Sequence, residues 1–132
     1  MAKLLTMLQI LIIPKGVNKS INSYLTSKEL DCKCSSNLCH YTLFNKDLSI
    51  KFLGVRMAMG RPLFINSAFR CQSHNTHVGG VDESSHTTGN ALDISTFSFS
   101  DIEKAQLIEL CKNQFDFVKV YPTFVHCQVN PK

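Results

Sequence analysis

The chain has 132 residues, of which 44% are hydrophobic and 18% are charged, and its formal net charge is +4. That length suits one domain with its own core, and the composition excludes a disordered or fibrous chain. The modest positive charge would favour an anionic surface such as a cell-wall polymer, but no basic stripe studded with aromatic residues predicts nucleic-acid binding. We therefore expect one monomeric domain over residues 1–132 that binds no nucleic acid.

The N-terminal segment carries an apolar run from Leu4 to Ile13 behind Lys3. The run is too short to span a membrane, so we expect no stable membrane insertion. It weakly resembles the core of a signal peptide, but no small-residue cleavage site follows it. We favour a strand or short helix packed on the domain, and treat residues 1–23 as a lead-in.

Two helical segments are predicted in the first half of the chain. Residues 25–32 form a short helical turn that begins at Thr26 or Ser27. Residues 45–59 form a longer helix, which Gly60 ends. Its apolar positions recur at helical spacing: Leu48, Phe52, Val55 and Met59.

The second half of the chain is dominated by strand patterns. Strands are predicted at residues 62–69, 91–95, 115–121 and 123–129. A long polar loop is expected over residues 70–90. Ser100 and Glu103 form a capping box for a helix through about Asn113. Its inner face is predicted as Ile102, Ala105 and Ile108. The order of elements predicts an α+β fold, a small antiparallel sheet with helices packed on it.

Six cysteines raise the question of redox state and metal binding. Cys32, Cys34 and Cys39 are clustered beside His40, but this C-x-C-x4-C-H spacing differs from the usual paired zinc motifs. We favour reduced thiols, while a disulfide or a second, structural zinc stays open. Cys127, on a predicted strand, is expected to pack as a small apolar residue. The remaining cysteines, Cys71 and Cys111, are scattered.

His86, Asp93 and His126 are candidates for one metal site. Gly89 breaks the chain between His86 and Asp93, so one side chain comes from a loop and the other from a strand. Strand alternation places Leu92 toward the core and Asp93 on the wetter face. If the strands of Asp93 and His126 are antiparallel neighbours, the two side chains lie side by side. Two imidazoles and one carboxylate would leave a fourth zinc position open, as catalytic zinc requires.

The motif S-x-H-x-x-G-x-A-x-D, at residues 84–93, resembles the zinc D-alanyl-D-alanine carboxypeptidase family. The resemblance covers residues 24–129, including INSAFR before the motif and YPTFVHCQV after it. LTSKELDCKC looks like the opening of short phage-type members. The family shares the fold of the hedgehog signalling domain, so the resemblance implies that fold here.

Carried over residue by residue, the resemblance implies that His86, Asp93 and His126 are the zinc ligands. It implies that Arg70 holds a substrate carboxylate, and that Ser85 forms a hydrogen bond near the site. We expect Gly79 and Gly80 to permit a tight backbone path. His74 and His77 match no ligand position, and are expected in the loop or the substrate cleft.

The chain departs from the family pattern at the proton acceptor. Some relatives place a glutamate where this chain has Thr123, and others place an aspartate where it has Gln128. Gln128 can orient water but cannot accept a proton as a carboxylate does. Glu83 is the preferred candidate base, and Asp82 and Asp116 are alternatives; we expect Asp116 to serve as a turn or strand-end residue.

The resemblance therefore implies a zinc metallopeptidase that cleaves peptidoglycan stem peptides, either as a D-Ala-D-Ala carboxypeptidase or as an endopeptidase between L- and D-residues. We expect a protein made in the cytoplasm of a bacterial host and acting on the cell wall or periplasm, for phage lysis or wall degradation. The alternative hypothesis is a non-catalytic, zinc-stabilised module that binds the wall.

Overall fold

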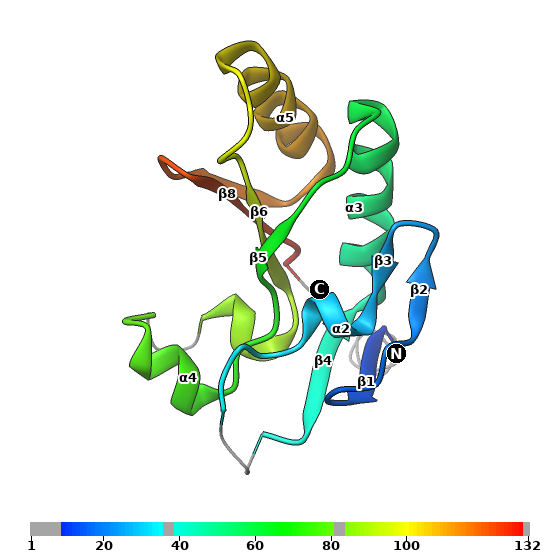
Figure 1. Cartoon of the computed structure of the whole chain (residues 1–132), viewed down its shortest axis with the longest axis vertical. Coiled ribbons are helices and arrows are strands. Elements are labelled where there is room, and N and C mark those ends of the chain that lie inside the picture. Colours follow the sequence, from blue (N-terminus) through cyan, green and yellow to red (C-terminus); the bar gives the residue numbers. More distant parts are fainter. Residues whose placement is uncertain (1–8, 36–38, 81–83, 131–132) are drawn as a thin grey trace.

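The structure is a computed structural model that describes residues 9–35, 39–80 and 84–130. Figure 1 shows the arrangement of its elements. The helical elements are α2 (Ser27–Leu30), α3 (Lys46–Met59), α4 (Gln72–His77), the 3-10 turn η1 (Ser85–Thr88) and α5 (Asp101–Gln114). The strands are β1 (Ile10–Pro14), β2 (Ser20–Asn22), β3 (Leu25–Thr26), β4 (Tyr41–Asn45), β5 (Ile65–Ser67), β6 (Ala91–Ser95), β7 (Phe117–Val120) and β8 (Phe124–Gln128).

The largest sheet has the strand order β5-β6-β8-β7, and every neighbouring pair is antiparallel. The α+β prediction, a small antiparallel sheet with helices packed on it, is confirmed. The predicted strands of the second half are all present, although the one predicted at residues 62–69 shortens to β5. β6 lies between β5 and β8, so it is an inner strand with a hydrogen-bonded neighbour along each edge.

The hydrophobic core lies between this sheet and the two long helices. Figure 1 shows α3 and α5 next to each other and α4 at a distance from them. Leu48, Phe52 and Val55 of α3 are buried as predicted, and Met59 packs against them from the edge. Each fully buried side chain of this kind contributes about 1.5–3 kcal/mol. The face of the sheet turned toward the helices adds Leu92, Ile94, Val125 and Cys127 to the core; the prediction that Cys127 packs as an apolar residue is confirmed.

Helix α5 begins at the predicted capping box but buries a different face. The side chain of Ser100 accepts from the backbone of Glu103, whose carboxylate accepts from the backbone of Ser100. Of the predicted inner face, Ile108 packs against the core, whereas the prediction is wrong for Ile102, which is 83% exposed, and for Ala105, which is also exposed. Positions three residues apart drift around a helix of 3.6 residues per turn. The buried residues are Leu107 and Cys111, four apart and on one face.

The segment predicted as one polar loop, residues 70–90, contains two helical elements. Cys71 caps α4 through its sulfur, which accepts from the backbone of His74. Ser84 caps η1 through its hydroxyl, which accepts from the backbone of His86. Short polar side chains favour such caps, so a polar composition did not exclude helical turns here.

The N-terminal strands form two smaller sheets, which the sequence did not predict. β1 pairs with β4, and β2 pairs with β3. β1 confirms a strand for Ile10–Pro14, whereas the first part of the apolar N-terminal run lies outside the described residues. In β4 the alternation buries Thr42 and Phe44. The predicted helical turn is α2, with Thr26 as its cap.

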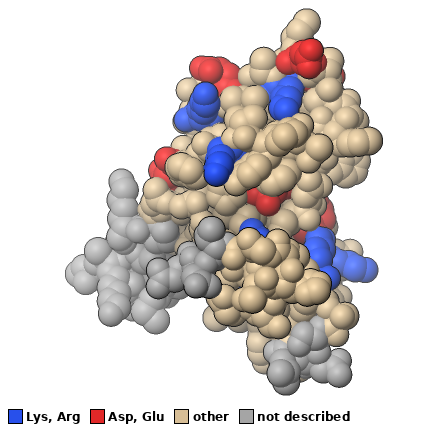
Figure 2. Space-filling view, turned by 90° about the vertical axis from the view of Figure 1, so that its left-hand side faces the viewer, with Lys and Arg blue, Asp and Glu red and all other residues tan. Residues whose placement is uncertain are grey.

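No described helix has the length and apolar character needed to cross a membrane. Figure 2 shows a face on which lysine and arginine side chains lie among aspartate and glutamate side chains. Charges of both signs are therefore interspersed on this face.

Candidate functional site

Asp93 and His126 lie directly opposite each other in the main sheet. The register of β6 and β8 pairs the two residues, so the condition set in the sequence analysis, that their strands are antiparallel neighbours, is met. Their side chains project from the face of the sheet opposite to Leu92 and Cys127. Asp93 lines the cleft on the face away from the core, as predicted, but it is only 7% exposed, and His86 lies against it.

His86 reaches the same place from the 3-10 turn η1. Gly89 ends the turn with a φ of +78°. A Cβ atom at this position would lie 2.5 Å from the carbonyl oxygen of Leu43, so both the conformation and the close approach require glycine. The backbone N–H of Arg70 donates to the carbonyl of His86 over 3.1 Å. The close approach of Gly89 to Leu43 and the hydrogen bond from Arg70 therefore fix the position of the turn. His86 is only 1% exposed.

The three side chains converge on one point. His126 Nδ1 lies 3.0 Å and His86 Nε2 lies 3.2 Å from Asp93 Oδ1. The potential ligand atoms of the three residues all lie within 4.8 Å of one another. Two ligand atoms of a tetrahedral zinc, each about 2.0–2.1 Å from the metal, are separated by about 3.3 Å. The spacing therefore suits a metal ion of this size.

The hydrogen-bond partners of the two imidazoles allow the tautomers that a metal ion requires. His86 Nδ1 donates to the carbonyl of Ala68 over 2.6 Å, which leaves a lone pair on Nε2. That Nε2 atom is buried and has no hydrogen-bond partner among the described residues. His126 Nδ1 lies 3.0 Å from Asp93 Oδ1, and its Nε2 lies 3.1 Å from Gln128 Oε1. Both oxygens are acceptors, so the tautomer that donates to Gln128 is the one that leaves a lone pair on Nδ1 for a cation beside Asp93.

The electrostatics of Asp93 keep it ionised. Burial by itself raises the pKa of Asp93, but the hydrogen bonds and charges of His126 and His86 outweigh it and leave the pKa below its usual value. One carboxylate and two neutral imidazoles form a donor set that zinc prefers, with a fourth position left for water or substrate. The residues present therefore fit a zinc ion.

The three side chains lie in an open cleft of about 710 Å³, a volume typical of ligand pockets. Arg70 also lines the cleft, and its Nε atom is buried without a hydrogen-bond partner among the described residues. Burial lowers the pKa of Arg70, whereas the charge of Asp93 raises it, and a guanidinium stays charged at neutral pH in any case. Arg70 is thus positioned to meet an anionic group of a ligand.

The two glycines before the motif have different roles. Gly79 adopts a φ of +75°, which glycine permits. A Cβ atom on Gly80 would lie 2.1 Å from Asn75 Oδ1 and 3.0 Å from Arg70 Nη1. Gly80 therefore gives Arg70 the space that it occupies, in keeping with the tight path expected from the sequence.

The remaining histidines divide between the cleft and the surface. His74 lines the cleft, where burial and then the charge of Arg70 lower its pKa. His77, one turn further along α4, is exposed. Neither belongs to the group of His86, Asp93 and His126, as the sequence predicted.

Aromatic and basic residues of β7 and of the position that follows it line the cleft as well, and the sequence reasoning missed them. Phe117, Lys119 and Tyr121 all reach the cleft. Lys119 pairs with His126 in the register, and the ring of Phe117 lies edge-on to His126 with centroids 6.1 Å apart. Tyr121 stacks on Phe124 at 4.4 Å. Phe117, Lys119 and Tyr121 are spaced two residues apart, and this alternation could have predicted that they lie on one face.

Gln128 and Ser85 form one hydrogen-bonded network at the site. Ser85 Oγ donates to Gln128 Oε1 over 2.6 Å, and the same oxygen accepts from His126. Gln128 Nε2 donates to Asn130 Oδ1 over 2.8 Å. Gln128 therefore fixes the orientation of His126, and Ser85 in turn fixes Gln128.

The candidate bases are only partly described. Glu83, the preferred one, and Asp82 lie outside the described residues. Asp116 accepts from the backbone of Asn130 over 2.7 Å and does not line the cleft, which agrees with a strand-end role. Of the described residues lining the cleft, Asp93 is the one carboxylate.

The comparison with known families adds to this geometry. The family model described as peptidase M15 matches residues 23–128. The chain belongs to the peptidase M15 family. M15 peptidases are zinc-dependent, so membership identifies the chain as a metallopeptidase domain, and the group of His86, Asp93 and His126 supplies a zinc-compatible site in it. No curated protein matches the chain.

Proposed function

We propose that this M15 peptidase hydrolyses the stem peptides of peptidoglycan. One observation supports the proposal most directly: His86 Nε2 and His126 Nδ1 both lie next to the ionised Asp93, in a cleft that the Arg70 side chain also lines. The S-x-H-x-x-G-x-A-x-D resemblance at residues 84–93 supports the same substrate class. Whether each of these residues acts as a ligand or a substrate contact stays a prediction.

In this proposal His86, Asp93 and His126 hold the zinc. When bound, zinc acts as a Lewis acid that polarises a carbonyl and lowers the pKa of water. Arg70 binds a substrate carboxylate through its planar fork and so fixes the scissile bond in the cleft. Gln128 keeps His126 in the tautomer that presents Nδ1 to the metal.

The charges of the cleft favour a peptide with a free carboxylate. Lys33 and Lys119 line it together with Arg70, so three cations and one carboxylate are present among its described lining residues. Phe117 and Tyr121 offer apolar walls to the small side chains of a stem peptide. We favour D-Ala-D-Ala carboxypeptidase activity on this basis. Endopeptidase cleavage between L- and D-residues is the second possibility, which product analysis separates from the first.

The proposal extends to the proton acceptor and to the biological setting. Glu83 is the base we propose. Glu83→Gln should then remove hydrolysis and keep zinc, whereas Asp82→Asn should keep both. A lack of effect from Glu83→Gln would assign the base elsewhere. The resemblance to short phage-type members supports a role in phage lysis or wall degradation, for a protein made in a bacterial cytoplasm and acting on the wall.

The decisive experiment measures metal content and muropeptide products together. Purified protein is incubated with peptidoglycan, and products are identified by mass spectrometry. We expect release of D-alanine, and loss of both this activity and one zinc per chain in His86→Ala. His77→Ala is the matched control, because His77 is exposed outside the metal-binding group. Zinc with wall binding but no product would instead support the non-catalytic module.

A further inference from the structure

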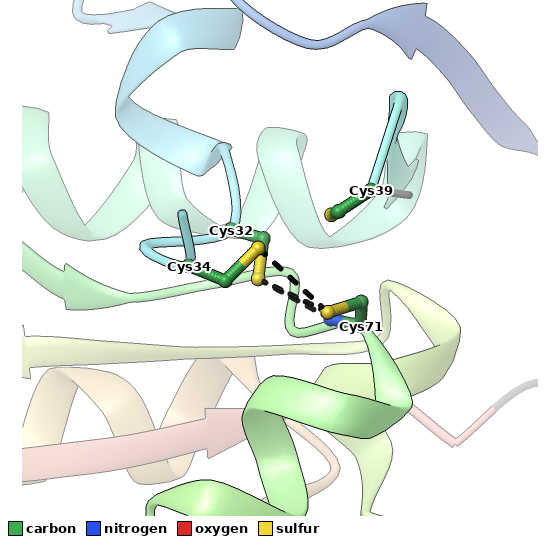
Figure 3. A group of neighbouring side chains, drawn as sticks. All are labelled: Cys32, Cys34, Cys39 and Cys71. Atoms are coloured by element: carbon green, nitrogen blue, oxygen red, sulfur yellow. Dashed lines mark hydrogen bonds between the residues drawn. The ribbon is translucent and has the colours of Figure 1, made fainter. Parts of the chain in front are cut away.

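A second group of potential metal ligands consists of four cysteines. Cys32 and Cys34 follow α2, Cys39 precedes β4, and Cys71 caps α4. Figure 3 shows these side chains directed toward one another from three separate segments. Their sulfur atoms all lie within 4.8 Å of one another, and none of the six cysteines, which all lie in the described ranges, forms a disulfide.

The distances between the sulfur atoms match a shared metal better than a disulfide. Cys71 Sγ lies 3.7 Å from Cys32 Sγ and 3.8 Å from Cys34 Sγ. A disulfide requires about 2.05 Å between its sulfur atoms. Four thiolates around zinc, each at about 2.3 Å from the metal, lie about 3.8 Å apart. The cluster thus has the dimensions of a tetrahedral site.

Donors to sulfur surround the cluster. The backbone N–H of Cys71 donates to Cys32 Sγ over 3.4 Å, and that of His74 donates to Cys71 Sγ over 3.5 Å. Lys15 Nζ lies 3.2 Å from Cys34 Sγ and also donates to the carbonyl of Cys34 over 3.1 Å. Four thiolates with one Zn²⁺ would carry two negative charges, and such donors stabilise negative charge on sulfur.

We propose that Cys32, Cys34, Cys39 and Cys71 bind a structural zinc ion, separate from the site in the cleft. Four protein ligands close the coordination shell and leave no position for a substrate, which is the mark of a structural site. On binding, Zn²⁺ forms four bonds to sulfur, and the thiol protons pass to the solvent.

The zinc would join distant parts of the chain, next to Lys33 and Arg70, which line the cleft. Cys32 and Cys71 are 39 residues apart in sequence, and Lys15 brings the end of β1 to the same cluster. Cys71 directly follows Arg70, so its ligation would hold the backbone that carries the Arg70 guanidinium. The N–H of Phe69 donates to the carbonyl of Leu30 over 3.1 Å and reinforces the same junction. The inference does not depend on the proposed substrate.

Metal stoichiometry tests the proposal on the full chain. Protein purified in reductant with added zinc should contain two zinc ions per chain, and Cys34→Ser should contain one. His86→Ala should also contain one, and the combination of both substitutions none. Cys111→Ala is the matched control, because Cys111 is a buried cysteine outside the cluster, and it should keep two. One zinc in the unsubstituted protein, unchanged in Cys34→Ser, would overturn the proposal.

Spectroscopy of the unsubstituted protein decides the matter even if a cysteine variant does not fold. After Co²⁺ replacement we expect thiolate-to-cobalt charge-transfer absorption that persists in His86→Ala. X-ray absorption at the zinc edge should show a sulfur shell at about 2.3 Å. Iron in place of zinc, a Cys32–Cys71 disulfide in the purified protein, or zinc with only nitrogen and oxygen neighbours would each contradict the assignment. None of these readouts depends on hydrolysis, so failure of the proposed peptidase function would be distinguishable.

Discussion

The described residues include two groups of potential metal ligands that are built in different ways. His86, Asp93 and His126 offer nitrogen and oxygen in an open cleft, two of them from paired strands. The cysteine cluster of Cys32, Cys34, Cys39 and Cys71 offers sulfur alone, from loops and a helix cap. Three ligands with an open fourth position suit catalysis, and four ligands suit structure. If both groups bind zinc, one small domain uses one set of residues for a catalytic metal and another set for a structural metal.

The largest effect is expected from a substitution in the group of His86, Asp93 and His126. Asp93→Asn replaces the ionised carboxylate between the two imidazoles with a neutral amide of the same size. We expect peptidase activity to fall about 10³-fold or more, because a Lewis-acid metal supplies several kcal/mol and each 1.4 kcal/mol is tenfold. Product release from peptidoglycan measures this. Asp116→Asn is the control, and equal losses in the two variants would contradict a special role of Asp93.

The second prediction concerns the contribution of the cysteine cluster to the stability of the fold. In His86→Ala, which retains only the cysteine cluster as a zinc site, zinc at about 100 times its dissociation constant should raise the free energy of unfolding by about 2.7 kcal/mol. The reason is that the folded chain alone brings the four thiolates together. Urea denaturation with and without zinc measures the change. No change with zinc would show that the cluster adds nothing to folding.

A smaller effect is expected at Gln128, which orients a ligand. Gln128→Ala removes the acceptor for His126 Nε2 and Ser85 Oγ. We expect a loss of roughly 10-fold to 100-fold in activity or in zinc affinity at the cleft, the range for partners of metal ligands. Gln128→Glu should restore zinc affinity, because its carboxylate can accept both hydrogen bonds. If the glutamate variant binds zinc no better than the alanine variant, the loss in Gln128→Ala results from altered packing and not from the lost hydrogen bonds.

The smallest effect concerns neither site. Ser100→Ala removes the cap of α5, where the Ser100 hydroxyl accepts from Glu103 N over 3.2 Å. We expect a loss of about 1 kcal/mol in the free energy of unfolding, the usual effect of losing a helix cap. Zinc content and peptidase activity should stay unchanged. A drop in zinc content or in peptidase activity would show that the start of α5 is coupled to the metal sites, contrary to this expectation.

The sequence by itself determined the elements whose signals are local. Strand alternation placed Asp93 and His126 on one face, and the register confirms that they are partners. Helical spacing identified Leu48, Phe52 and Val55, and the capping box located the start of α5. Each of these signals depends on residues within a few positions of one another, so it can be read without a fold.

Tertiary structure decided what depends on distant segments. Cys71 lies far along the chain from the C-x-C-x4-C group, so its sulfur could join the cluster only once the fold brought the start of α4 next to the segment that follows α2. Asp93 is buried although it lies opposite the core face of its strand, because the turn η1 brings His86 against it, and Ile102 in the first turn of α5 is exposed. Spacing along the chain fixes local geometry, whereas a site formed by several segments requires the packed core that brings them together.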